Sequence, residues 1–334
     1  MSDYLLSINN LRLSFFTNVG EVKALNDVTI KLKKGEVLGI VGESGSGKSV
    51  TAYSVMGLTA HPGRIVAGSI EFDGKLINEM SEKEMRDIRG NDIGMIFQDP
   101  MTSLNPVYTI GNQICESILL HTNKNKKQAK ERAVELLELV GINEPAKRMK
   151  QYPHELSGGM RQRVMIAIAL ACEPKLLIAD EPTTALDVTI QAQILELMME
   201  LKEKIDMSII MITHDLGIVA NMCSKIAVMY AGKVAEYGGV DDIFYNPRHE
   251  YTKGLLNSIP KLFSQDHEKL IAIEGTPVDM LHPPKGCPFA PRCDSAMKIC
   301  LEQMPDFSKV GEEHYSACWL IEKEEFNRGG KKDD

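Results

Sequence analysis

The strongest constraint on the fold is a short apolar run that leads directly into a glycine-rich segment. Residues Val37–Val41 are typical of a buried parallel strand, the segment GESGSGKS follows at 42–49, and residues 50–56 can continue as a helix. A strand, a glycine-rich turn and a helix in this order form phosphate sites, because N–H groups at the helix start surround the anion. A turn without a ligand is the alternative, and the flanking strand and helix make it the weaker interpretation.

The residues of this loop have distinct expected roles. Lys48 would reach the β- and γ-phosphates of a bound nucleotide, and Ser49 would ligate Mg²⁺. Four further loop residues would surround the phosphates: Gly42, Ser44, Gly45 and Gly47. We therefore expect an α/β fold that binds ATP together with Mg²⁺.

A second apolar run, residues 175–179, ends in two carboxylates, Asp180 and Glu181. In an open α/β sheet, ligands lie beyond the carboxyl ends of the strands. We expect Asp180 to face the Mg²⁺ held by Ser49, and Glu181 to polarise the attacking water. An acidic strand end is weak support by itself, but it gains weight from a phosphate loop in the same chain.

Polar side chains follow two more apolar runs. His214 comes after residues 207–213, and its place at a strand end favours a γ-phosphate contact over a purely structural role. Gln98 comes after residues 93–97 and could sense Mg²⁺ or the attacking water. The sequence therefore predicts that both side chains belong to the nucleotide site.

The segment Leu156-Ser157-Gly158-Gly159 begins another predicted helix, over residues 158–171. Ser157 can cap this helix, whose positive end would point at a γ-phosphate.

Taken together, these motifs resemble the nucleotide-binding subunit of an ABC transporter over about the first two-thirds of the chain. The motifs occur in that family's order: the phosphate loop (42–49), the Gln loop (Gln98), the Leu-Ser-Gly-Gly motif (156–159), the Asp-Glu strand end (180–181), an Ala-Leu-Asp loop (Ala185 to Asp187) and the switch His214. Met160 departs from the family, which usually has Gln there, whereas residues 161–163 match.

The resemblance implies a P-loop NTPase of ABC type with a mixed sheet core. Residues 1–237 would form the nucleotide-binding domain, with a helical subdomain at about 98–172. Residues of two motifs would contact the nucleotide held by a partner cassette: Ser157, Gly158, Gly159 and Asp187. An aromatic side chain should stack on adenine; Phe16 fits this role, Phe15 is not excluded, and a core position for either is about equally supported.

The segment 99–106 contains two prolines, which predict an ordered loop rather than a helix. It resembles the segment of the oligopeptide/dipeptide importer subfamily that contacts a helix of the membrane subunit. The alternative is a simple connector.

The region 238–334 is irregular and contains four of the seven cysteines: Cys287, Cys293, Cys300 and Cys318. Disulfides are rare in the cytosol, and zinc prefers closer pairs of ligands, whereas four thiolates on an irregular loop suit a [4Fe-4S] cluster. The region resembles the tail of peptide and nickel importer ATPases, including residues 251–256 and Pro260, and some members bind such a cluster there. Zinc and free thiols remain alternatives.

Composition supports a folded chain that reaches the membrane through partners. The chain has 334 residues with 43% hydrophobic content, enough for two domains, and its net charge of −8 does not indicate a nucleic-acid-binding face. Its longest apolar run, near 164–172, is shorter than the about 20 residues of a membrane span, and no secretory segment opens it. We expect a peripheral protein at the cytoplasmic face of the membrane.

The resemblance implies an ATPase that powers uptake of di- or oligopeptides. Its expected partners are a second, different ABC ATPase that completes a heterodimer, two membrane permease subunits and an extracytoplasmic substrate-binding protein. Import of nickel or another small solute is the alternative within this subfamily. A soluble ABC-type ATPase acting on ribosomes or DNA and a redox-responsive regulator are the alternatives outside it.

Overall fold

The computed structural model describes residues 3–99, 103–184, 186–258 and 272–323. The chain forms two compact units, and each is assembled from segments that are distant in sequence. The loop-bearing unit comprises Leu6–Lys31, Leu38–Asp73 and Thr213–Asp334. The helical unit comprises Met1–Leu5, Leu32–Val37 and Gly74–Ile212.

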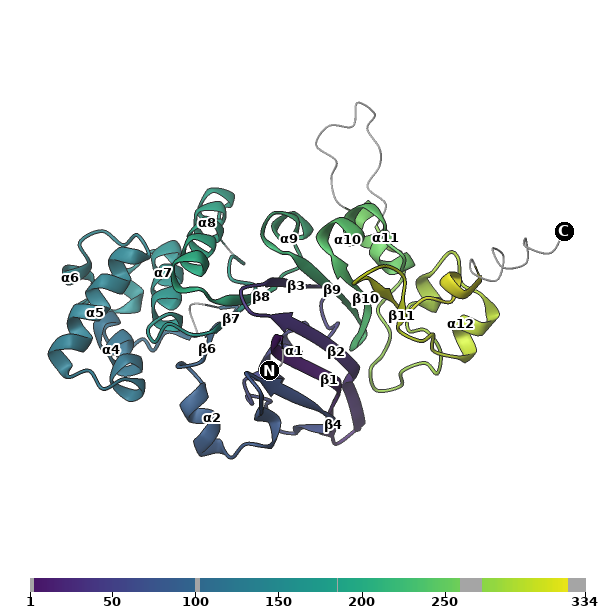
Figure 1. Ribbon diagram of the computed structural model, residues 1–334, viewed down its shortest axis with the longest axis horizontal. Helices are drawn as coiled ribbons and strands as arrows, with labels where there is room; N and C mark the ends of the chain where they lie inside the picture. The colour runs from purple at the N-terminus through teal and green to yellow at the C-terminus, as the bar shows by residue number, and fades with distance from the viewer. Residues whose placement is uncertain (1–2, 100–102, 185, 259–271, 324–334) are drawn as a thin grey trace, which may run out of the picture. The chain divides into compact units, whose positions relative to one another are not determined.

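The loop-bearing unit contains two groups of strands (Figure 1). The first group has the order β2-β1-β4, formed by β1 (Tyr4–Thr17), β2 (Gly20–Lys33) and β4 (Gly63–Phe72). The second has the order β11-β12-β10-β9-β3, formed by β3 (Val37–Val41), β9 (Lys225–Tyr230), β10 (Lys233–Gly239), β11 (Ser308–Lys309) and β12 (Tyr315–Ser316). Because β3 and β9 are parallel while β9 and β10 are antiparallel, this second group is a mixed sheet.

A tight turn explains the antiparallel pair of β9 and β10. Tyr230 pairs with Lys233, so only Ala231 and Gly232 connect the two strands. Both connecting residues have positive φ, 47° and 72°, as the two-residue hairpin turns that match strand twist require.

The helical unit contains three parallel strands in the order β8-β7-β6: β6 (Ile93–Ile96), β7 (Leu176–Asp180) and β8 (Ser208–Ile212). Every residue of the three is buried, which explains why they are continuous apolar runs without alternation. A two-residue strand, β5 (Lys75–Leu76), also belongs to this unit.

Each unit also contains helices, which Figure 1 labels. The loop-bearing unit has α1 (Lys48–Val55), α9 (Leu216–Met222), α10 (Val240–Tyr245), α11 (Glu250–Asn257), η3 (Ala290–Arg292) and α12 (Lys298–Glu302). The helical unit has η1 (Ile77–Glu79), α2 (Glu82–Ile88), α4 (Ile110–His121), α5 (Lys126–Leu139), α6 (Pro145–Arg148), η2 (Pro153–Glu155), α7 (Gly158–Ala169) and α8 (Val188–Ile205). The helices α4, α5 and α7 pack against one another. Among the residues that the structure describes, no helix is long and apolar enough to cross a membrane.

Helix ends follow local capping rules. The side chain of Asn125 accepts hydrogen bonds from the first turn of α5, and the Gln128 side chain accepts one from the Asn125 N–H. The helix ends at Leu139, before Gly141 with its φ of 74°. The helix α7 ends two residues earlier than predicted, at Ala169.

Candidate functional site

The glycine-rich loop joins β3 to α1, and its geometry requires glycine at specific positions. Gly42 has a φ of 150°, and a Cβ added there would lie 2.1 Å from the carbonyl oxygen of Met229. Gly47 has a φ of 101°, and a Cβ there would lie 2.9 Å from Leu25. The loop can therefore take this tight path only with glycine at both positions.

The loop encloses Lys48, which begins α1. The Lys48 ammonium donates to the carbonyl oxygens of Gly42 and Glu43, at 2.7 and 2.9 Å. The hydroxyl of Ser46 is buried and has no hydrogen-bond partner among the described residues. The helix has no side-chain cap and no acidic residue in its first turn, so the positive end of its dipole is directed at the loop. A buried cation, an orphaned hydroxyl and a helix N-terminus fit a phosphate ligand.

The helical unit holds the two carboxylates that follow β7. Asp180 is the last residue of the strand and is fully buried. Glu181 has a φ of 47°, and its N–H donates to the carbonyl oxygen of Ile212 at 2.9 Å. The Glu181 carboxylate accepts from Gln98 Nε2 at 2.8 Å and from Thr184 Oγ1 at 2.9 Å.

Two side chains therefore hold Glu181 in place, and the sequence pointed to only one of them. Gln98 was expected in the nucleotide site, where it would sense Mg²⁺ or the attacking water, whereas Thr184 was given no role there. The available signal was its spacing, since a hydroxyl three residues after the carboxylate can reach back across a turn; Thr184 N–H does donate to Glu181 O at 3.2 Å.

The Leu-Ser-Gly-Gly motif lies at the start of α7. The hydroxyl of Ser157 accepts from the N–H of Met160 at 3.3 Å, so Ser157 is the N-cap that the sequence predicted. Met160 needs only its backbone for this contact, so the departure from Gln leaves the cap unchanged. A Cβ added to Gly159 would lie 3.0 Å from Ile190, which shows how closely this turn approaches α8.

Asp187 and His214 lie at two further helix starts. Asp187 caps α8 by accepting from the N–H of Ile190 at 2.9 Å. His214 is exposed and directly precedes Asp215, the N-cap of α9. Ala185, the first residue of the Ala-Leu-Asp loop, lies outside the described residues.

The two candidate aromatics on β1 differ in exposure. Phe15 is half-buried and packs against Gly63, where an added Cβ would lie 2.6 Å from its ring. Phe16 is 38% exposed, and the guanidinium of Arg64 lies 4.1 Å from its ring centroid. Of the two, Phe16 is the ring that a base could reach.

In the segment after Gln98, Ser103 is helical and residues 104–106 lie outside helices and strands. The N–H of Ser103 donates to Asp99 O at 3.2 Å, which is the hydrogen bond of a helical turn. Residues Pro100, Met101 and Thr102 lie outside the described residues.

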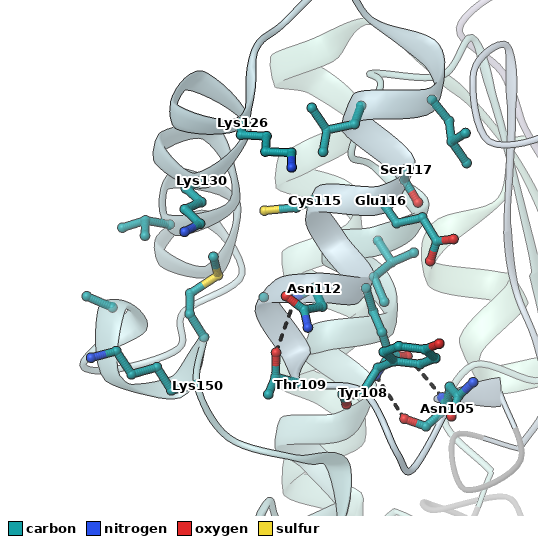
Figure 2. A pocket seen from close by; sticks show the side chains of 18 of the residues that line it. Asn105, Tyr108, Thr109, Asn112, Cys115, Glu116, Ser117, Lys126, Lys130 and Lys150 are labelled. Atoms are coloured by element: carbon teal, nitrogen blue, oxygen red, sulfur yellow. Dashed lines mark hydrogen bonds between the residues drawn. The ribbon is translucent and has the colours of Figure 1, made fainter.

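This segment adjoins a hollow of about 1250 Å³ in the helical unit (Figure 2). Its walls come from α4, α5, α6 and residues 103–109. Tyr108, Leu119 and Leu120 are exposed apolar side chains in its lining. Figure 2 shows Lys126 and Lys130 of α5 facing the α4 residue Cys115 across the hollow.

All four cysteines of the C-terminal region line one small cavity, together with Phe289 and Trp319. Burial raises the pKa of Cys287 and of Cys293 to about 11, and it also raises the pKa of Cys318. The thiols are thus gathered, but the described part of the chain has no group of three or more His, Cys, Asp or Glu arranged to hold a metal. The other three cysteines, Cys115, Cys172 and Cys223, are half-buried.

Comparison with known proteins gives two family matches. The model of the ABC transporter family matches residues 25–184, and that of the oligopeptide/dipeptide transporter C-terminal region matches residues 235–300. The first range contains the phosphate loop, Gln98, Ser157 and both carboxylates; the second contains the first three cysteines of the C-terminal cavity, and Cys318 lies beyond it.

Individual proteins are similar over almost the whole chain. The oligopeptide transport ATP-binding protein OppD of Bacillus subtilis is 60% identical over 95% of this chain and 89% of its own length. The dipeptide transport ATP-binding protein DppD of the same species is 54% identical over 94% of each chain. Among solved structures, the dimeric ATP-binding cassette MJ0796 in a post-hydrolysis state with ADP and phosphate has a TM-score of 0.64 at 27% identity, over 70% of this chain and 98% of that one.

Proposed function

The chain belongs to the family of ABC transporter ATP-binding proteins, and from this premise we propose that it hydrolyses ATP to power uptake of di- or oligopeptides. The observation that best supports ATP hydrolysis is the geometry of the glycine-rich loop. Two carbonyl oxygens of this loop accept hydrogen bonds from the Lys48 ammonium. Peptides are the proposed transported solute because both matched regions are similar to those of peptide-transport proteins.

The loop residues would bind the nucleotide. Lys48 and the N-terminus of α1 neutralise the β- and γ-phosphates, and the N–H groups of Ser44, Gly45 and Gly47 complete the cradle. Phe16 stacks on the adenine ring. Ser49, Gln98 and Asp180 would hold Mg²⁺, which neutralises developing charge on the phosphates. These three residues offer the oxygen ligands that Mg²⁺ prefers.

Glu181 orients the attacking water. Two hydrogen bonds to its carboxylate, from Gln98 and Thr184, fix the side chain that would accept from water. His214 contacts the γ-phosphate. Because Gln98 bonds to Glu181 and directly precedes the segment 99–106, its motion would connect the state of the nucleotide to that segment.

Ser157, Gly158, Gly159 and Asp187 serve the nucleotide of a partner cassette. The cap at Ser157 leaves the positive end of α7 for a γ-phosphate, which is the arrangement that closes when two cassettes meet. We propose that the partner is a second, related ATPase, so that the complete motor is a heterodimer. The nucleotide-binding domain would comprise residues 1–237, with the helical subdomain at about 98–172.

The hollow of the helical unit would receive a membrane permease subunit. Tyr108, Leu119 and Leu120 supply apolar surface, and Lys126 and Lys130 supply charge on its other wall. Two permease subunits and an extracytoplasmic substrate-binding protein complete the importer. The chain would therefore work at the cytoplasmic face of the membrane.

The four-cysteine cavity in the region 238–334 would hold a [4Fe-4S] cluster. Its support is the donor set, since four thiols line one cavity shielded by Phe289 and Trp319. Anaerobically purified protein should then contain iron, acid-labile sulfide and broad absorbance near ~400 nm. A preparation with zinc or with no metal would reject the cluster and leave zinc or free thiols.

A gentle detergent pull-down of this chain from native membranes tests the transport role. Two multi-span proteins and a second ATPase should co-purify, and the associated binding protein can be tested with peptides and with nickel. Nickel binding without peptide binding would replace the proposed solute with the alternative one. Recovery with ribosomes or DNA, and with no membrane protein, would contradict import.

A further inference from the structure

We propose that Arg292, in the cysteine-bearing segment of the C-terminal region, is a positioning residue of the phosphate-binding loop and thereby sets the affinity of this chain for ATP. The inference rests on the ATP site proposed above. It adds to that site a residue 249 positions away from the loop residue that it contacts.

The side chain of Arg292 forms an ion pair with Glu43, the second residue of the loop. Its Nη1 lies 2.6 Å from Glu43 Oε2, and its Nη2 lies 3.0 Å from Glu43 Oε1. Two parallel N–H···O bonds of this kind fix the orientation of a carboxylate as well as its distance. The backbone carbonyl of the same Glu43 is one of the two acceptors of Lys48. Arg292 and the phosphate-binding ammonium of Lys48 therefore contact the same residue, Glu43.

The guanidinium itself is held rigidly. Its remaining contacts are with the carbonyl oxygens of Ile273 and Glu274, at 3.1 and 2.9 Å, and with the hydroxyl of Tyr230, at 3.2 Å. These bonds and the pair with Glu43 use all five N–H donors, and the side chain is 4% exposed. The hydrogen bond with Glu43 raises the pKa of Arg292 above its usual value, so the cation persists at every accessible pH.

A second residue of the C-terminal region holds the backbone at the same point. The N–H of Glu43 donates to the hydroxyl of Tyr251 at 2.8 Å, and Tyr251 is fully buried. The Tyr251 ring packs against Tyr230 and Phe289, at centroid distances of 4.6 and 5.3 Å. Glu43 is thus held at both its side chain and its backbone by residues that lie after the strands of the nucleotide-binding fold.

The cysteine cavity lies next to the ion pair between Arg292 and Glu43. Arg292 N–H donates to Phe289 O, Ala290 N–H to Cys287 O, and Cys293 N–H to Ala290 O. One short turn therefore carries Arg292 between two of the four cavity thiols.

The competing explanation is that the pair only attaches the C-terminal region to the fold. A matched pair elsewhere separates the two explanations. Lys225 on β9 binds Glu313 at 2.8 Å, so it also ties the C-terminal region to the sheet, but neither residue belongs to the loop or contacts Glu43. Loss of this second pair should affect attachment alone.

The test compares ATP binding by Arg292→Gln, Glu43→Gln, the double variant and Glu313→Gln, all in the full chain. We expect Arg292→Gln to weaken ATP binding about tenfold and to raise the KM for ATP more than it lowers kcat, because a charged bidentate contact is removed. Glu43→Gln should have a similar effect, and the double variant should be no worse than the single ones, since both remove one interaction. Arg292→Lys should restore part of the affinity, and Glu313→Gln should match wild type.

Several results would overturn this inference. The first is that Arg292→Gln binds ATP as tightly as Glu313→Gln does, and that only the melting temperature of Arg292→Gln is lowered. If Arg292→Gln does not fold, the Glu43→Gln variant provides the test, because Glu43 is 28% exposed and tolerates an amide. An unchanged ATP affinity of Glu43→Gln would also reject the proposal. Failure of the wild-type chain to bind ATP would instead reject the proposed function.

Discussion

Replacement of Gly42 by alanine should disrupt the phosphate loop far more than replacement of Gly45, although both residues belong to the same motif. Both have positive φ, 150° and 76°. A Cβ at Gly42 would lie 2.1 Å from Met229 O and 2.8 Å from Ser46 Oγ, whereas a Cβ at Gly45 would meet nothing within 4 Å. The comparison therefore separates steric exclusion from backbone strain.

The magnitudes follow from these distances. At Gly45 the cost is backbone strain alone, about 1–2 kcal/mol for a residue with a side chain in the left-handed region. At Gly42 the loop and β9 must also separate by about 1 Å to bring the contact with Met229 to an ordinary distance. A clash of a backbone oxygen with a side chain in a packed site adds roughly 2–3 kcal/mol, so Gly42→Ala should lose about 3–5 kcal/mol.

The assay is urea unfolding of both variants, with ATP binding measured in parallel. We expect a lower midpoint for both at an unchanged m-value, with the larger shift for Gly42→Ala, and loss of ATP binding for that variant. Equal midpoints, or retention of ATP binding by Gly42→Ala, would refute the argument that Met229 O excludes a side chain there.

Three further predictions concern single interactions. Lys48→Ala should weaken ATP binding at least about 100-fold in an equilibrium titration, because it removes the phosphate-contacting charge; an unchanged affinity would exclude Lys48 from the site. Thr184→Ala should lower kcat about tenfold in steady-state kinetics with little change in KM, since one of two bonds that orient Glu181 is lost; a change in KM alone would contradict this role. Because burial raises the pKa of Cys287 and Cys293 to about 11, both thiols are protonated at pH 8, and iodoacetamide should modify the metal-free protein there more slowly than a free thiol. The rate should rise towards pH 11, and fast modification at pH 8 would contradict the burial.

The strand ends were predictable because parallel strands place their carboxyl ends at one edge of a sheet. That rule drew attention to Gln98 and Glu181, which share a hydrogen bond. The cap at Ser157 was predictable too, because capping depends on residue type and a spacing of three. Both inferences rest on local chemistry that the sequence carries directly.

Other contacts depend on tertiary packing and could not be predicted in this way. Glu43 is the second residue of the loop, and nothing in the sequence indicates that Arg292 and Tyr251 hold it. The four cysteines were expected to share one site and they do line one cavity, but nothing in the sequence indicates that Phe289 and Trp319 line it with them.

The most direct test of the account is ATP turnover by Glu181→Gln. Glutamine preserves the size of the side chain and an oxygen that can accept from Gln98 and Thr184, but it cannot polarise water as a carboxylate does. We predict that kcat falls by a factor of at least about 100 while ATP binding is retained, so that the variant accumulates bound ATP. Turnover near the wild-type rate would remove Glu181 from its role and contradict the mechanism proposed here.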